Sequence, residues 1–375
     1  MPGLLPNVDP DGLLEYSVVY TDRSLNHMSR AFQQVMTDIA RDLKHTYNAH
    51  ALAIVPGGGT FAMESVARQF AQGRHALIIR NGFFSFRWTQ ILDTGSIATR
   101  STVLGARALH DAAQAPFAPA PLDEIVAAIR SERPGVVFAP HVETASGIIL
   151  PHDWIREIAR ATHEIGGLFV LDCIASGAIW VDMRANGVDV LISAPQKGWS
   201  ATPCAGLVML GEAARRHIDT TTSNSFATDL KRWLGIMESY EGGGHAYHAT
   251  MPTDGLRMLR AAIAETLAFG LEASRSAQQR LGDGVRTLLA ARGFPSVAAP
   301  GFGAPGVVVS HTTDPEIHNG SRFRTAGLQI AGGVPLQCGE RADFRSFRIG
   351  LFGLDKLKDV EGTVARLERA LDTMV

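Results

Sequence analysis

The sequence has few lysines, few cysteines and no basic cluster. Among 375 residues, five are lysine and three are cysteine, and the formal net charge is −2. The near balance of charge argues against a nucleic-acid partner or binding to an anionic membrane surface. The cysteines, Cys173, Cys204 and Cys338, lack the paired spacing of a zinc site or a disulfide framework. We therefore expect reduced thiols and no metal site.

Long hydrophobic runs are missing as well. The apolar stretches have the length of strands, and Gly, Pro or charged residues interrupt them. The N-terminus, MPGLLPNVDPDGLLEY, lacks the basic region and the long apolar core of a signal peptide. These absences predict a cytoplasmic protein without a membrane partner. With 46% hydrophobic residues, the chain can bury a large core and is long enough for two domains.

The most regular pattern is an alternation of strand-like and helix-like segments between about residues 50 and 210. Such alternation is typical of an α/β fold with a mostly parallel central sheet between helices. The expected strands are 50–55, 76–80, 135–141, 168–173, 190–194 and 206–210. In such sheets, ligands bind beyond the carboxyl ends of the strands, so the residues that follow each strand are candidates for a site.

The rest of the chain predicts a second, smaller domain. A continuous helical pattern covers residues 254–294, and strand patterns at 306–311 and 346–353 precede a closing helix. We expect a large domain over residues 20–275 and a smaller C-terminal α+β domain over 276–375. The N-terminal segment 1–19 is expected to pack near the smaller domain.

Lys197 directly follows an apolar run in VLISAPQKGW. An ammonium group at the end of a buried strand is costly, and desolvation lowers its pKa until the free amine is a nucleophile. Lys197 is therefore a candidate Schiff-base lysine. The alternative is a lysine in a turn whose ammonium group lies in water.

Two further segments bear on this choice. In VPGGGTFAMESV a strand runs through three glycines into a helix, an arrangement whose N–H groups bind anions, although it has neither the Walker nor the dinucleotide spacing. Asp172 ends an apolar strand, where a carboxylate can pair with a protonated pyridine nitrogen. Together with Lys197, these features supply the three anchors of pyridoxal phosphate: its phosphate, its ring nitrogen and its aldehyde.

Seven segments in order resemble the class V aminotransferases of pyridoxal-phosphate fold type I, and most closely the alanine/serine-glyoxylate aminotransferase group. The resemblance covers about residues 25–353. The segments are GGGTFAMESV, RNGFFSFRW, HVETASGI, LDCIASG, SAPQKGW, AYHATMP and FRIGLFG. The resemblance implies pyridoxal 5'-phosphate as cofactor and a homodimer with shared active sites. It also implies transfer of an amino group from a small amino acid, such as alanine or serine, to a 2-oxo acid such as glyoxylate or pyruvate.

The same resemblance implies a role for each matching residue. Lys197 and Asp172 are the catalytic residues, and Arg348 binds the substrate carboxylate, with Arg345 as its competitor. Tyr247 and Thr250 are expected to reach the cofactor phosphate of the neighbouring subunit. The cofactor-binding residues are Gly58, Gly59, Thr60, Phe84, Thr144, Asp172, Ile174, Gln196, Lys197, Tyr247 and Thr250.

The sequence departs from the family pattern at two places. It reads EYSVVYTDRSLNHMSRAF where the family usually has a Pro-Gly-Pro-like turn near the substrate pocket, and His27 in this segment either lines the pocket mouth or packs. Ala145 stands where many relatives carry Ser or Thr, so one hydrogen bond is lost unless Thr144 or Ser146 compensates.

Three alternative functions stay open. The first is a cysteine desulfurase or β-eliminating lyase that uses Cys338 as its thiol, and the second is a 2-aminoethylphosphonate-type transaminase. The third is a scaffold protein without cofactor, in which Lys197 has no chemical role.

Overall fold

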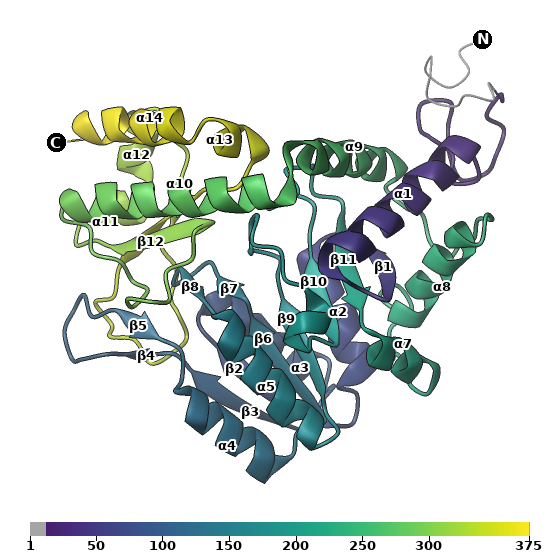
Figure 1. Ribbon diagram of the computed structural model, residues 1–375, viewed down its shortest axis with the longest axis horizontal. Helices are drawn as coiled ribbons and strands as arrows, with labels where there is room; N and C mark the ends of the chain where they lie inside the picture. Colours follow the sequence, from purple (N-terminus) through teal and green to yellow (C-terminus); the bar gives the residue numbers. More distant parts are fainter. Residues whose placement is uncertain (1–12, 375) are drawn as a thin grey trace.

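The computed structural model describes residues 13–374 and has a seven-stranded sheet at its centre (Figure 1). The strand order is β1-β11-β10-β9-β6-β2-β3. Adjacent strands are parallel except where β11 pairs antiparallel with β1 and with β10. The strands are β1 Ala51–Pro56, β2 His75–Arg80, β3 Arg100–Gly105, β6 Val136–Pro140, β9 Leu168–Asp172, β10 Val190–Ser193 and β11 Ala205–Leu210.

Each of the six predicted strands coincides with a strand of this sheet to within two residues at either end. The predicted α/β class with a mostly parallel sheet is confirmed. The sequence did not predict β3, which lies at the sheet edge. Its residues, RSTVLG, are only half-buried or exposed, so it lacks the continuous apolar run that marks an inner strand.

Helices pack against this sheet, α2 next to β11, α3 next to β2, α5 next to β9 and α8 next to β1. One apolar core, extending from Leu25 to Ile263, joins the sheet and these helices. The helices before residue 250 are α1 Arg30–Tyr47, α2 Gly59–Phe70, α3 Phe83–Thr94, α4 Leu122–Glu132, α5 His152–Glu164, α6 Met183–Asn186, α7 Glu212–Asp219 and α8 Leu230–Glu241.

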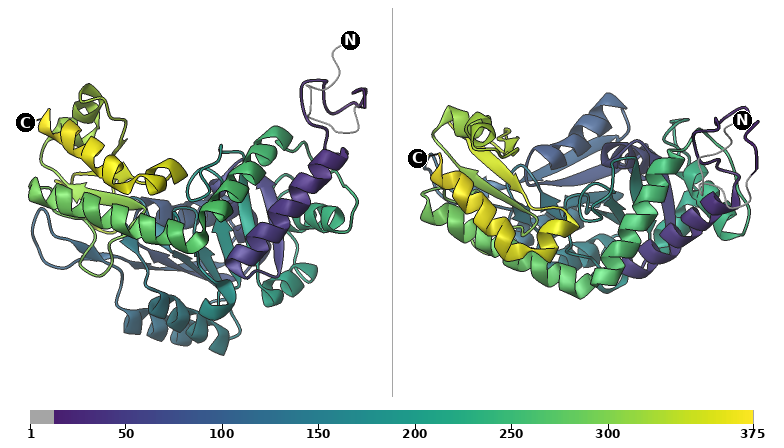
Figure 2. Two further views of the ribbon diagram at one scale, coloured as in Figure 1. Left: turned by 45° about the horizontal axis from the view of Figure 1, so that its top comes forward. Right: turned by 90° about the horizontal axis from the view of Figure 1, so that it is seen from above.

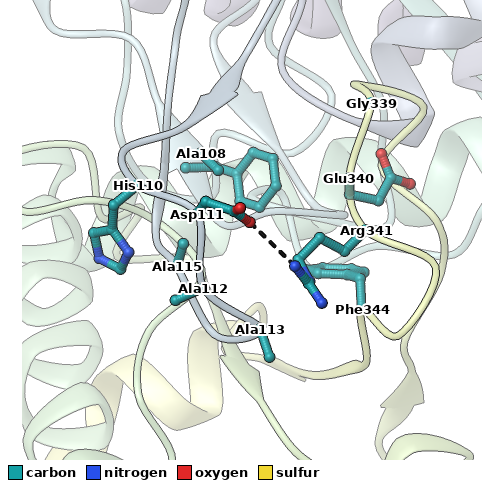
Figure 3. A pocket seen from close by; sticks show the side chains of 11 residues that line it. Ala108, His110, Asp111, Ala112, Ala113, Ala115, Gly339, Glu340, Arg341 and Phe344 are labelled. Atoms are coloured by element: carbon teal, nitrogen blue, oxygen red, sulfur yellow. Dashed lines mark hydrogen bonds and ion pairs between the residues drawn. The ribbon is translucent and has the colours of Figure 1, made fainter.

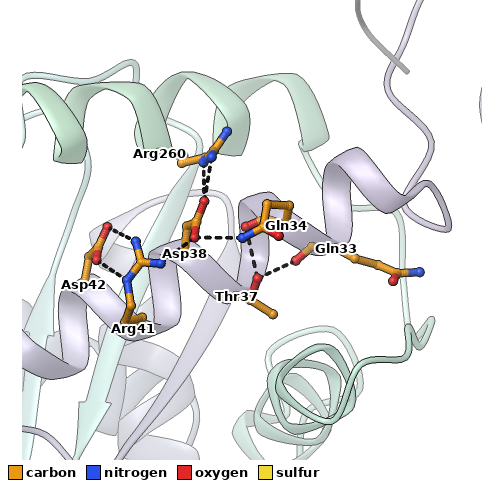
Figure 4. Close-up of polar contacts among 7 residues, drawn as sticks. All are labelled: Gln33, Gln34, Thr37, Asp38, Arg41, Asp42 and Arg260. Carbon is orange, nitrogen blue, oxygen red and sulfur yellow. Dashed lines mark hydrogen bonds and ion pairs between the residues drawn. The ribbon is translucent and has the colours of Figure 1, made fainter. Parts of the chain in front are cut away.

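Helix α1 shows how local sequence and packing agree. Ser29 caps its N-terminus by accepting a hydrogen bond from the Phe32 N–H, and its buried residues recur at helical spacing. The buried Asp38 carboxylate of α1 forms an ion pair with Arg41 of the same helix and one with Arg260 of α9 (Thr253–Phe269), which Figure 4 shows. The pair with Arg260 connects α1 to the helix that leads into the C-terminal part.

The predicted long helix over 254–294 is two helices, α9 Thr253–Phe269 and α10 Leu271–Ala291. The break is at Gly270, whose φ of 99° suits glycine because it has no Cβ. The helical pattern continues across this glycine because a single Gly is tolerated inside a helix, so periodicity alone did not reveal the break.

The C-terminal part has its own antiparallel sheet, with strand order β12-β14-β13. Helices α10 and α14 pack beside it around a second apolar core that extends to Leu371 (Figures 1 and 2). The remaining elements are β4 Arg107–Ala108, β5 Phe117–Ala118, β7 Val142–Glu143, β8 Ile148–Ile149, β12 Val307–His311, α11 Pro315–His318, α12 Ser321–Thr325, β13 Ala331–Gly332, β14 Ser346–Gly350, α13 Leu354–Lys358 and α14 Val360–Asp372. The domain boundary near residue 275 stays a prediction, and this position lies inside α10.

Residues 13–19 lie beyond the N-terminal end of α1, at the opposite end of the molecule from α14 (Figure 1). Here Glu15 accepts a hydrogen bond from the side chain of Asn26 at 2.8 Å. Within one chain, residues 13–19 are thus remote from the C-terminal part, and the expected packing of segment 1–19 stays a prediction. Residues 1–12 lie outside the described residues. Among residues 13–374, none of the helices combines the length and apolar character that a membrane crossing requires.

Candidate active site

A cavity of about 200 Å³ lies where the ends of β9 and β10 approach the N-terminus of α2. It is lined by Gly59, Thr60, Met63, Phe84, Arg87, Val142, Thr144, Asp172, Ile174, Ala175, Gln196 and Lys197. The structure therefore brings together most residues that the sequence nominated. Gly58 caps the adjacent helix, whereas Tyr247, Thr250 and Arg348 are not among the lining residues.

One end of the cavity is suited to an anion. Helix α2 begins at Gly59, and its first intrahelical hydrogen bonds come from the Phe61 and Ala62 N–H groups, which both donate to the Gly58 carbonyl. The N–H groups of Gly59 and Thr60 precede these bonds and are available to a ligand. A Cβ on Gly59 would lie 2.5 Å from Cδ1 of Ile174. Glycine thus leaves room that any other residue would fill.

Arg87 of α3 adds a cation at this end, because its Nη1 donates to the Thr60 hydroxyl at 3.0 Å. Its guanidinium carbon also lies 4.8 Å from the centroid of the Phe84 ring. Gln196 extends the polar lining, since its Oε1 is buried and has no hydrogen-bond partner among the described residues.

Asp172 ends β9, and its Oδ1 accepts a hydrogen bond from the Ile174 N–H at 2.9 Å. Burial raises the pKa of the Asp172 carboxyl to about 7; the Ile174 N–H opposes this rise and the Glu143 carboxylate adds to it. A cationic group beside Asp172 would favour its ionised form. A protonated pyridine nitrogen is such a group.

Lys197 is half-buried and lines the same cavity. Burial lowers the pKa of its amine, and the charges of Arg348 and Arg87 lower it further. Its Nζ lies 4.8 Å from the centroid of the Phe352 ring, and no hydrogen bond or ion pair to Nζ is present among the described residues. The amine is therefore more readily deprotonated than an exposed lysine.

The position of Phe84 depends on Glu143, a fully buried carboxylate. Glu143 accepts hydrogen bonds from the Phe84 N–H at 3.2 Å, from the Ser85 N–H at 2.8 Å and from the Ser85 hydroxyl at 2.7 Å. Its fourth donor is the Ala145 N–H at 2.9 Å. These bonds satisfy the start of α3 and fix Phe84 at the cavity.

Arg348 lies on β14 and reaches the same region, with its guanidinium carbon 5.5 Å from the Phe84 ring centroid. Its Nε donates to the Gly332 carbonyl at 2.8 Å, and among the described residues its two Nη groups have no partner. Arg345 is exposed and lies just before β14, outside the strand that carries Arg348. This geometry favours Arg348 over Arg345.

The remaining nominated residues have distinct surroundings. The Ser146 hydroxyl donates to the Asn81 carbonyl, so Thr144, which lines the cavity, is the better placed of the two to compensate for Ala145. His27 is 6% exposed and packs against three aromatic rings, which favours the packing interpretation. These rings belong to Tyr20, His245 and Tyr247.

Tyr247 is 52% exposed, and its hydroxyl lies 3.2 Å from that of Thr250. Both hydroxyls are thus close together at the surface of the chain. The intersubunit role of the pair stays a prediction.

Besides the apolar lining residues Met63, Val142 and Ala175, three residues at the site were not nominated from the sequence: Arg87, Glu143 and Phe352. Arg87 could have been found, because it follows Phe84 by three residues, about one helical turn, in RNGFFSFRW. Glu143 is the one acidic residue of HVETASGI, but nothing in this segment reveals its hydrogen bonds to α3. Phe352 follows an apolar strand and has the pattern of a core residue.

A larger cavity, of about 340 Å³, lies between the loops around residues 110 and 341 (Figure 3). Its lining is mostly alanine, glycine and phenylalanine. Two of its charged side chains, Asp111 and Arg341, form an ion pair with each other at 3.1 Å. This cavity has no buried amine or acid comparable to Lys197 and Asp172, so the smaller cavity is the candidate active site.

Comparison with known proteins agrees with this site. The family model described as aminotransferase class-V matches residues 13–301. This chain belongs to the class-V aminotransferase family. It is 27% identical over 355 residues to the 2-aminoethylphosphonate–pyruvate transaminase 1 of Burkholderia lata, covering 92% of this chain and 90% of that protein. It is also 27% identical over 363 residues to the alanine–glyoxylate aminotransferase of Oryctolagus cuniculus, covering 92% and 86%.

Solved structures of class-V and related aminotransferases share the fold. The alanine–glyoxylate aminotransferase of Nostoc sp. superposes with a TM-score of 0.77 at 22% identity, covering 93% of this chain and 89% of that one. The pyridoxamine-pyruvate aminotransferase of Mesorhizobium loti gives 0.75 at 15% identity, covering 94% and 87%. The family and the fold type I neighbours imply pyridoxal phosphate. The glycine space at Gly59, the free N–H groups at the start of α2 and the Asp172 carboxyl fit this cofactor.

Cys338 does not have the surroundings of a reactive thiol. Burial raises the pKa of its thiol to about 12, and its Sγ lies 3.5 Å from the carbonyl oxygens of Arg80 and Leu336. The reactive form of cysteine is the thiolate, which these surroundings disfavour. The desulfurase alternative therefore has no support from the site.

Proposed function

We propose that this class-V aminotransferase moves an amino group from a small neutral amino acid, such as alanine or serine, to glyoxylate or pyruvate. The observation that carries the proposal is the placement of the Lys197 amine, the Asp172 carboxyl and the α2 N-terminus around one cavity, with the Arg348 guanidinium beside Phe84. The name of the alanine–glyoxylate relative supports this donor and acceptor, and the name of the 2-aminoethylphosphonate–pyruvate relative supports pyruvate as an acceptor.

Pyridoxal phosphate, when bound, supplies an aldehyde that condenses with amines and a ring that accepts the electrons of a broken Cα–H bond. The α2 N–H groups, the Thr60 hydroxyl and Gln196 would hold its phosphate, with Arg87 supplying positive charge. Phe84 and Ile174 would enclose its ring, and Asp172 would keep the ring nitrogen protonated. The Thr144 hydroxyl, which also lines the cavity, would contact the cofactor.

Lys197 would act as the general base and acid. Because burial and the neighbouring cations lower its pKa, its Nζ loses its proton more readily than that of an exposed lysine and can then accept the α-proton of the substrate. The same Nζ then gives this proton back, so the residue ends in its starting state. The free Nη groups of Arg348 fit the two oxygens of an α-carboxylate and would orient the Cα–H bond toward Lys197.

Two kinds of amino donor compete for the Arg348 guanidinium. A single arginine with two free Nη groups suits one carboxylate, but a phosphonate would satisfy the same groups. We propose the carboxylate, and 2-aminoethylphosphonate is the competing donor. A half-reaction screen that follows the absorbance of the bound cofactor with alanine, serine and 2-aminoethylphosphonate decides between them.

The decisive variant is Lys197→Ala. It should lose both turnover and the absorbance band of the lysine-bound cofactor, because no other described amine lines the cavity. Lys231→Ala, on the exposed side of α8, is the matched control and should retain both. Near-normal turnover of Lys197→Ala would refute the assignment. A wild-type protein that stays colourless after incubation with pyridoxal phosphate would favour the scaffold alternative.

We further propose a homodimer whose subunits share active sites. Tyr247 and Thr250 present their hydroxyls at the surface, and they belong to the segment that resembles the family's intersubunit phosphate contact. Cytoplasmic location stays a prediction from the sequence.

A further inference from the structure

Phe352 is the aromatic residue that contacts the candidate catalytic amine. It lies just after β14, four residues beyond Arg348, and its ring centroid is 4.8 Å from Lys197 Nζ. The ring packs closely beside glycine backbone. A Cβ on Gly306 would lie 3.2 Å from its Cε1, and one on Gly350 would lie 3.8 Å from its Cδ2. The missing Cβ of Gly306 thus leaves room for this ring, whereas a Cβ on Gly350 would make only an ordinary contact with it.

Hydrogen bonds connect the Phe352 turn to the Lys197 turn. The Leu354 N–H donates to the Ser200 hydroxyl at 2.7 Å, and the Ser200 N–H donates to the Lys197 carbonyl at 3.1 Å. On the other side, the Lys356 ammonium donates to the Phe352 carbonyl at 2.8 Å. The two turns therefore belong to one hydrogen-bonded unit, which fixes the backbone that carries the ring relative to the backbone that carries the amine.

This placement restricts the substrate. If the proposed function holds, the substrate must bring its Cα hydrogen to Lys197 Nζ and its carboxylate to Arg348. Its side chain then shares the space beside the amine with the Phe352 ring. We propose that Phe352 is a specificity-determining residue that limits the amino donor to a small side chain.

The test replaces the ring in steps, with Phe352→Leu and Phe352→Ala. Phe344→Leu is the matched control, because Phe344 belongs to the same apolar cluster but its ring contacts Phe117 and His311. The half-reaction is followed with alanine, 2-aminobutyrate, norvaline and phenylalanine. One or two methylenes in an apolar pocket typically change kcat/KM by about 10- to 200-fold.

Phe352→Ala should raise the ratio of kcat/KM for norvaline over alanine by about tenfold or more, and Phe352→Leu should give an intermediate value. Phe344→Leu should leave the ratio at its wild-type value. An unchanged ratio in both Phe352 variants would overturn the proposal. If Phe352→Ala fails to fold, the ratio in Phe352→Leu decides.

A second readout needs neither turnover nor cofactor. In the cofactor-free protein, Lys197 is reductively alkylated with formaldehyde and with the larger butyraldehyde, and the modified peptide is quantified by mass spectrometry. The butyraldehyde-to-formaldehyde ratio should rise in Phe352→Ala and stay constant in Phe344→Leu. If no donor reacts with the wild type, the proposed function fails. The alkylation ratio then tests by itself whether the Phe352 ring restricts the space beside the Lys197 amine, and an unchanged ratio refutes that restriction.

Discussion

Asp172 is a buried carboxyl whose pKa of about 7 makes folding depend on pH. Its pKa is higher in the folded chain than in the unfolded chain. Between about pH 4 and 7 the folded state therefore holds a proton that the unfolded state has lost, and stability falls as pH rises. Above pH 7 this penalty is complete, and it is roughly 4 kcal/mol at most.

Replacing Asp172 by Asn should remove this penalty. In the cofactor-free protein, Asp172→Asn should gain stability relative to wild type as the pH goes from 5 to 8. Urea unfolding at both pH values measures the difference. A difference that is the same at pH 5 and at pH 8 would show that the carboxyl is not neutral in the folded protein.

Arg87 places a positive charge at the phosphate end of the cavity through its bond to Thr60. Arg87→Met keeps the apolar stem and removes the charge. We expect the affinity for pyridoxal phosphate to fall about 10- to 100-fold, the value of a hydrogen bond to a charged group. Fluorescence titration of the cofactor-free protein measures it. Arg68→Met, whose arginine pairs with Glu64 farther along α2, is the control and should bind normally.

The sequence revealed those site residues that stand out against their immediate neighbours in the chain. Lys197 and Asp172 each interrupt or end an apolar run, a contrast that is visible in the sequence itself. Arg87 was missed although it lies one helical turn after Phe84, whereas Glu143 and Phe352 were missed because their partners come from other segments. Glu143 lies 58 positions from Ser85, for example. Such pairs become visible only when the sheet brings the segments together.

At the scale of elements, α3 depends on a carboxylate that comes from outside the helix. Glu143 accepts hydrogen bonds from two N–H groups of its first turn and from the Ser85 hydroxyl. Glu143→Gln replaces one acceptor oxygen by an NH₂ group, which leaves buried donors without partners. The free energy of unfolding should fall by roughly 2 kcal/mol. Thermal or urea unfolding measures this change.

Glu157→Gln is the comparison for this variant. Glu157 forms an exposed ion pair with Arg160 on α5, and such pairs contribute little to stability. This control should unfold like the wild type. Equal stability of Glu143→Gln and Glu157→Gln would contradict the role of Glu143 at α3.

The elements were predicted where burial gives a strong pattern. Inner strands such as β2 and β9 have continuous apolar runs and were found at nearly their observed bounds. The edge strand β3 and the break at Gly270 were not found. In both cases the deciding information is tertiary or conformational, namely the pairing of β3 with β2 and the positive φ of Gly270.

At the scale of the whole molecule, the shared-site proposal predicts complementation between two defective chains. One chain carries Lys197→Ala, and the other carries Tyr247→Ala with Thr250→Ala. In the mixed dimer, the intact lysine lies in a site whose phosphate contacts come from the intact partner. This dimer should retain nearly one normal site, whereas each parent homodimer should be inactive or poor in cofactor.

The measurement is turnover and cofactor content of the mixed dimer, purified with two different affinity tags. Mixing wild type with the Lys197→Ala chain gives the reference value for one intact lysine per dimer. No recovery of the mixed mutants above their parents would refute the shared site. An active wild-type monomer would refute it as well.

The position of β11 has a consequence for how the chain folds. Strand β1 pairs with β11, which is synthesised about 150 residues later, on the order of 10 to 30 s at ordinary rates of translation. Until then, β1 has no hydrogen-bonded strand partner. The same pairing brings the Gly57 N–H to the Cys204 carbonyl and so joins the glycine turn to the segment that carries Lys197. Cofactor capture is therefore expected only after β11 has inserted between β1 and β10, late in folding.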